Sequence, residues 1–109
     1  MNAFHQESAQ KKWQEFSLIE QLANIGSEVS RAEKWQGKDE NIFWNIVIRA
    51  LELFDMTLCG RKGEKMLNEV ARVKELFCDA VLGAKEYKTN LKDLEKYFLN
   101  FAVLVRNKA

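Results

Sequence analysis

The segment CGRKGEK, residues 59–65, has the residue types of a phosphate-binding loop: two glycines and three basic side chains before an expected helix. Such a loop binds phosphate when its backbone amides and a lysine surround the oxygens. The spacing is wrong for a nucleotide-binding P-loop, because Gly60 and Gly63 are too close together and the Gly-Lys-Ser/Thr ending is missing. The simpler interpretation is a helix end, an exposed loop and a new helix start.

Basic residues elsewhere in the chain could join this loop. If the helices alternate in direction, the loop meets the start of the first helix and the C-terminal end of the last. Such a basic end could bind phosphate, RNA or an acidic partner. The helix dipole also favours basic residues near helix C-termini, which gives a purely stabilising alternative. This candidate anion-binding surface, the basic pole, consists of Lys11, Lys12, Arg61, Lys62, Lys65 and Arg106.

Catalysis and metal binding have few candidate residues. His5, the one histidine of the sequence, lies in an expected N-terminal extension. A ferritin-type metal bundle needs a Glu-x-x-His motif, and a HEPN-type ribonuclease needs an arginine followed closely by a histidine; the sequence contains neither. Cys59 and Cys78 lack the paired spacing of a zinc site. We therefore expect a protein that is not an enzyme and that binds no metal or cofactor.

Composition indicates one globular domain in a reducing compartment. The 109 residues are 47% hydrophobic and 30% charged, and their formal net charge is +1. This balance gives no strong field for nucleic acid or membranes, and no segment is apolar enough for a transmembrane span or a signal peptide. Cys59 and Cys78 are expected to be reduced thiols near the core of a cytoplasmic protein, with a disulfide as the alternative.

Residues that favour the start or the end of a helix occur at regular intervals along the chain. The sequence contains no proline, which is typical of a chain that is nearly all helix. Residues 17–20, Ser-Leu-Ile-Glu, have the form of a capping box, and Asp39 and Asn90 are suitable N-caps. Glycines indicate where the first three helices end. The predicted helices run from Ser17 to about Gln36, from Asp39 to Gly60, from about Glu64 to Gly83, and from Thr89 or Asn90 to the C-terminus.

Each predicted helix has an apolar line whose spacing is typical of helices packed nearly parallel to their neighbours. We therefore predict an all-α fold, an antiparallel up-and-down four-helix bundle, whose second helix is the most buried. It forms a single domain, 1–109, in which residues 1–16 are a possible N-terminal extension. Trp13 and Phe16 either continue the first helix backward or fold over its end. The apolar lines are Leu18-Leu22-Ile25-Val29-Ala32, Phe43-Val47-Ala50-Phe54, Met66-Val70-Val73-Phe77-Ala80 and Leu94-Phe98-Phe101-Val105.

Two small residues break the pattern of good helix formers in the first predicted helix. Gly26 and Ser30 stand four residues apart and share one face. A glycine inside a helix costs about 1 kcal/mol of stability relative to alanine. We therefore expect Gly26 to allow a contact that offsets this cost. Small side chains let another backbone come close. This face therefore predicts a helix contact, inside the bundle or between subunits, with a ligand-binding notch as the alternative.

Aromatic and basic residues beside this face suggest an interaction surface. Trp35 and Trp44 flank the first predicted loop, as core caps or as interface residues. Arg49 is expected to pair with Glu52 on the surface unless another subunit covers it. We expect an interaction or scaffold module that self-associates or binds another protein, and the alternative is a weak RNA or phosphate binder at the basic pole. The candidate interface is Gly26, Ser30, Trp35, Trp44 and Arg49.

Residues 16–55 resemble a family of short, uncharacterised prokaryotic helical proteins. More distantly, LANIGSEVSRA followed by ENIFWNIVIRALELF is similar in layout to the four-helix-bundle proteins encoded in intervening sequences of large-subunit ribosomal RNA genes. There, an ANIAEG-like helix precedes a helix with an IALGSL-like stretch. Residues 23–25 match the first pattern, residues 26–28 depart from it, and residues 48–51 approximate the second. The resemblance covers about two helices, implies a bundle and an oligomer, and transfers no catalytic residue.

Overall fold

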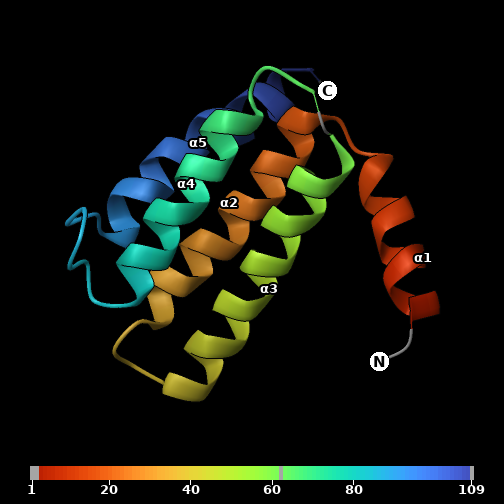
Figure 1. Cartoon of the computed structure of the whole chain (residues 1–109). Coiled ribbons are helices and arrows are strands. Elements are labelled where there is room, and N and C mark those ends of the chain that lie inside the picture. The colour runs from red at the N-terminus through yellow and green to blue at the C-terminus, as the bar shows by residue number, and fades with distance from the viewer. Residues whose placement is uncertain (1–2, 62, 109) are drawn as a thin grey trace.

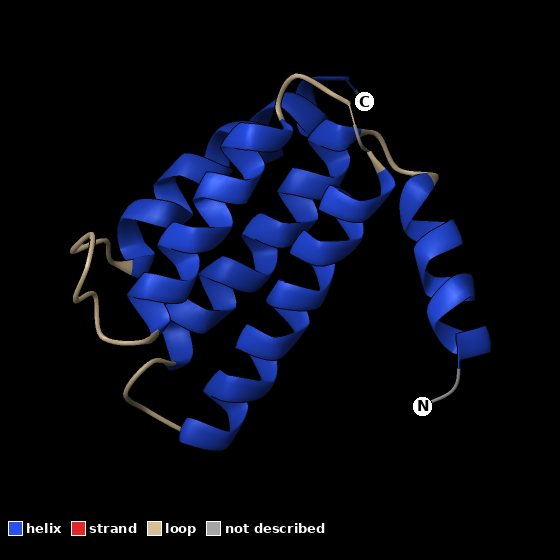
Figure 2. Cartoon of the chain, viewed as in Figure 1, coloured by secondary structure: helices blue, strands red, loops and turns tan. Residues whose placement is uncertain are grey.

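The chain folds into helices and the loops between them (Figure 2). The computed structural model describes residues 3–61 and 63–108, and the side chains of residues 8–61 and 63–107. No strand occurs in these ranges, and no helix there is long and apolar enough to cross a membrane. The all-α prediction is therefore confirmed for this part of the chain. The helices are α1 (Ala3–Gln14), α2 (Leu18–Trp35), α3 (Glu40–Gly60), α4 (Leu67–Val81) and α5 (Leu91–Lys108).

Helices α2 to α5 surround a common interior, and α1 lies outside them against α3 (Figure 1). Helix α2 packs against α3 and α5, and α4 also packs against both of these. The start of α2, the loop between α3 and α4, and the end of α5 lie at one end of the molecule (Figure 1). The two remaining connections, 36–39 and 82–90, lie at the other end.

The described residues form five helices rather than the predicted four. The additional helix is α1, which does not continue into α2, because Ser17 caps α2 with an extended backbone (φ −65°, ψ 163°). Helix α1 is attached to α3 by polar contacts: the indole Nε1 of Trp13 donates to Thr57 Oγ1 at 2.8 Å. The Nε2 atoms of Gln10 and Gln14 both donate to the carbonyl oxygen of Met56, at 3.1 and 3.0 Å.

Local capping signals explain most of the helix ends. The predicted capping box is present, since Glu20 N donates to Ser17 Oγ and Ser17 N donates to Glu20 Oε1. Asp39 caps α3 through Ile42 N, as predicted, and the Asn90 side chain accepts from the backbone of the first turn of α5. The start of α4 was predicted too early. Its first helical residue is Leu67, and Lys65 and Met66 form a turn before it.

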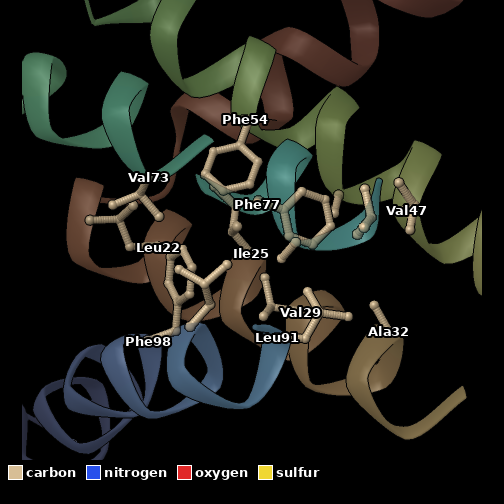
Figure 3. Close-up of a cluster of buried hydrophobic side chains, with 14 of the residues drawn as sticks. Leu22, Ile25, Val29, Ala32, Val47, Phe54, Val73, Phe77, Leu91 and Phe98 are labelled. Atoms are coloured by element: carbon tan, nitrogen blue, oxygen red, sulfur yellow. The ribbon is translucent and has the colours of Figure 1, made fainter. Parts of the chain in front are cut away.

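The predicted apolar lines meet in one core (Figure 3). Phe54, Phe77 and Phe98, from α3, α4 and α5, are fully or almost fully buried, with Phe54 beside both of the other rings. The second predicted helix is not the most buried one. Helix α2 buries seven of its 18 residues and α3 only five of its 21, because α2 packs more extensively, against both α5 and α3, whereas one side of α3 faces outward. The outer face of α3 leaves Ile48 exposed.

Candidate functional site

Gly26 and Ser30 contribute to a close contact between α2 and α5. A Cβ atom added at Gly26 would lie 2.6 Å from the Cβ of Phe98, which is closer than side chains approach one another. One turn along, Ser30 Oγ donates a hydrogen bond to the carboxylate of Glu95. The glycine is therefore needed for the approach of these two helices, and its face is occupied by the same chain.

The Gly26 contact makes a stability prediction. Gly26→Ala should lower the free energy of unfolding by about 1–2 kcal/mol, because overpacking costs about 1–3 kcal/mol and alanine returns at most about 1 kcal/mol of helix propensity. Ser27→Ala is the matched control, since Ser27 is exposed on the same helix and should be neutral or slightly stabilising. Urea unfolding followed by circular dichroism measures both. Equal stabilities of the two variants would contradict the packing argument.

Outside the Gly26 contact, a groove of about 320 Å³ runs between α2 and α5. A second hollow of about 240 Å³ continues it toward the end of α5 and shares Ala23, Ser27 and Ala102 with it. Leu99, which is 55% exposed, lines the groove. We call the first of these hollows the α2–α5 groove; its lining residues are Ala23, Gly26, Ser27, Ser30, Glu95, Lys96, Phe98, Leu99 and Ala102.

The other candidate interface residues lie apart from the α2–α5 groove. Trp35 is partly buried against the core, and Trp44 is exposed on α3 with its ring against Phe43. Arg49 forms no ion pair with Glu52, contrary to the expectation from their spacing. Its Nε lies 3.8 Å from Glu28 Oε2 on α2 instead. The structure thus brings Gly26 and Ser30 together, and it places the other three residues outside the lining of the groove.

The basic pole is only partly available for a ligand. The side chain of Arg61 is 17% exposed, and its guanidinium joins three segments of the chain. Its Nε donates to Gln21 Oε1 at 3.1 Å, its Nη1 to Glu64 Oε1 at 2.8 Å and its Nη2 to the carbonyl oxygen of Phe16 at 2.6 Å. Lys62 lies outside the described residues. The exposed members of the pole are Lys11, Lys12, Lys65 and Arg106.

No group of three or more His, Cys, Asp or Glu side chains in the described part of the chain could hold a metal ion. The side chain of His5 lies outside the described residues. Cys59 and Cys78 are free thiols, but Cys59 is exposed rather than near the core as expected. Burial and a hydrogen bond to Glu69 raise the pKa of Tyr97 well above its usual range.

Sequence reasoning missed the α5 side of the groove. Leu99 and Val103 are both exposed and stand four residues apart on the side of α5 away from its apolar line, and Leu99 lines the groove. An apolar pair on the outer face of an amphipathic helix was the available signal. It was not decisive, because isolated exposed apolar residues are common on protein surfaces.

Comparisons with protein-family models, with curated proteins and with solved structures find no match for this chain.

Proposed function

We propose that this chain is a non-enzymatic, cytoplasmic interaction module that associates with a second copy of itself through the α2–α5 groove. In this proposal α2 to α5 form an antiparallel up-and-down four-helix bundle and α1 extends it. The observation that carries the proposal is the exposed Leu99 in a groove lined by small side chains, with the exposed Val103 one turn further along α5. Small residues permit the close approach that packed helices need, and burying the exposed leucine supplies hydrophobic free energy.

The charges around the groove support a second copy as the partner. A two-fold interface pairs each surface with itself, so it needs side chains of both signs on one patch. The α2–α5 groove and the hollows that adjoin it have acidic and basic side chains in nearly equal number: Glu20, Glu33 and Glu95 with Arg31, Lys34, Lys96 and Arg106. A surface with this balance of charge does not favour a strongly charged partner.

Substitution of Leu99 tests self-association. Leu99→Glu should raise the dissociation constant of the dimer about a hundredfold or more. A two-fold contact would bury two new carboxylates, which is unfavourable, and each 1.4 kcal/mol of lost binding free energy raises the dissociation constant tenfold. Light scattering over a concentration series measures the mass against the 12.7 kDa of one chain.

Leu104→Glu is the matched control, because Leu104 is 47% exposed on the same helix but five residues away, on another side. It should leave the mass of the wild-type assembly unchanged. A wild-type protein that is monomeric at high concentration would rule out the proposal, as would dissociation caused by Leu104→Glu alone.

Weak binding of RNA or phosphate at the basic pole is the alternative proposal. It is supported by Lys65 and Arg106, which are exposed, and by the common end of the molecule at which their segments lie (Figure 1). It is weakened by Arg61, whose guanidinium is already engaged at three positions. Nucleic acid that remains bound through purification, seen as excess absorbance near its maximum, would favour this alternative over self-association.

A further inference from the structure

A buried carboxylate lies on the opposite side of α2 from the α2–α5 groove. The side chain of Glu28 is 8% exposed, and its Oε1 accepts a hydrogen bond from Arg31 Nη1 at 3.1 Å. Its Oε2 is buried and accepts no hydrogen bond within the described structure. Burial of a carboxylate oxygen without a hydrogen bond is unfavourable. We therefore expect this unfavourable burial of Glu28 to be offset by a functional role of the carboxylate.

Two arginines from neighbouring helices meet at Glu28. Arg31 of α2 is 66% exposed and Arg49 of α3 is 70% exposed. Arg49 approaches Glu28 through Nε, 3.8 Å from Oε2, which is too long for a hydrogen bond. A guanidinium has five N–H donors on a planar fork. Each arginine is thus held near Glu28 through one nitrogen and keeps most of its donors for a ligand.

We propose that Arg31 and Arg49, held by Glu28, form a binding site for a carboxylate of an acidic protein partner. Two guanidinium forks match the planar geometry of a carboxylate, which accepts paired hydrogen bonds. A bound carboxylate also restricts Arg49, so that its Nε can close the 3.8 Å gap and donate to Glu28 Oε2. The ligand therefore satisfies an acceptor that is left without a hydrogen bond in the free chain.

The surroundings of the site favour a protein partner over nucleic acid. Ile42, which is exposed, lies two helical turns before Arg49 on α3, and Trp35, which is partly buried against the core, lies one turn after Arg31 on α2. Nucleic-acid sites instead need a broad basic surface. The net charge of +1 provides no such field, and arginine beside apolar and aromatic side chains is typical of protein interfaces.

This site can be tested separately from the self-association proposed above. Glu28 and Arg49 lie on the α3 side of α2, whereas Gly26 and Leu99 line the groove on its α5 side; Arg31 contacts Glu28 and also borders a hollow beside the groove, so Arg49 is the residue that separates the two proposals. Leu99→Glu should therefore leave carboxylate binding unchanged. Failure of one proposal can be distinguished from failure of the other.

A fluorescein-labelled peptide of six glutamates is the probe, followed by fluorescence anisotropy at low ionic strength with the full chain. Arg49→Lys should weaken its binding at least about tenfold, because lysine keeps the charge but loses the fork. Arg31→Lys should do the same. Arg72→Lys, at an exposed arginine of α4, is the matched control and should bind like the wild type.

Three outcomes would overturn the inference. One is the absence of any binding of the peptide to the wild-type chain. Another is equal affinity of the wild type, Arg49→Lys and Arg72→Lys, which would show attraction by charge alone. The third is a single-stranded oligonucleotide that binds more tightly than the peptide and is lost in Arg49→Lys, since the site would then recognise phosphate. Circular dichroism checks that each variant is folded.

Discussion

Phe54→Ala should lower the free energy of unfolding by about 3–5 kcal/mol, the range found when a buried phenylalanine is truncated. The ring of Phe54 is fully buried, with its centroid 5.8 Å from that of Phe77 and 6.1 Å from that of Phe98. It therefore joins α3 to α4 and α5 at once, and alanine would leave a cavity that three helices must close. Small domains are stable by only about 5–15 kcal/mol, so this loss is a large fraction of the total.

Urea unfolding monitored by circular dichroism measures this change. Leu104→Ala is the matched control, because Leu104 is an exposed apolar residue of α5 and its truncation should change stability by about 0.5 kcal/mol or less. A loss below about 1 kcal/mol for Phe54→Ala would mean that the four helices are not packed around this ring.

Arg61→Ala should lower the free energy of unfolding by about 3 kcal/mol, since the partly buried hydrogen bond to Gln21 contributes about 1.5–3 kcal/mol and the two exposed hydrogen bonds add little. The largest part of the loss would come from the buried side chain of Gln21, which would lose a hydrogen bond. Its Nε2 donates to the carbonyl oxygen of Trp13 at 2.8 Å, and its Oε1 accepts from Arg61. Without the arginine, this oxygen has no donor among the hydrogen bonds of the described chain. The packing of the α1–α2 connection and of α2 against the loop after α3 should become less stable.

Lys65→Ala is the control for Arg61, because Lys65 is exposed in the same loop. It should leave the unfolding midpoint unchanged, whereas Arg61→Ala should shift it clearly. Equal stability of both variants would mean that Arg61 is a surface cation, available to a ligand at the basic pole. The two substitutions therefore also bear on the alternative function.

The helix ends could be predicted where a short segment contains the whole signal. Ser17 and Glu20 cap each other across three residues, and Asp39 needs only the backbone of Ile42. The apolar spacing likewise predicted which face of each helix is buried, because the period of the helix fixes it. The predicted start of α4 near Glu64 was wrong, since Met66 provides no side-chain cap that a sequence could reveal.

The candidate site could be predicted only in part. Gly26 and Ser30 indicated a close contact, but the sequence left open whether its partner was in the same chain. The structure assigns that partner to Phe98 and Glu95 of α5. The expected pair of Arg49 with Glu52 was wrong, because spacing along one helix does not show that Glu28 of another helix lies within reach.

By itself, the sequence determined the all-helical character of the chain, most of its helix ends and the apolar side of each helix. These depend on the helical period and on caps within a few residues of each other, so neighbouring residues contain the necessary information. Only the tertiary structure decided that α1 docks through Trp13 to Thr57, that Gly26 admits Phe98 and that Arg49 approaches Glu28. Such pairings depend on the rotation and separation of whole helices, which the packing of the entire core sets.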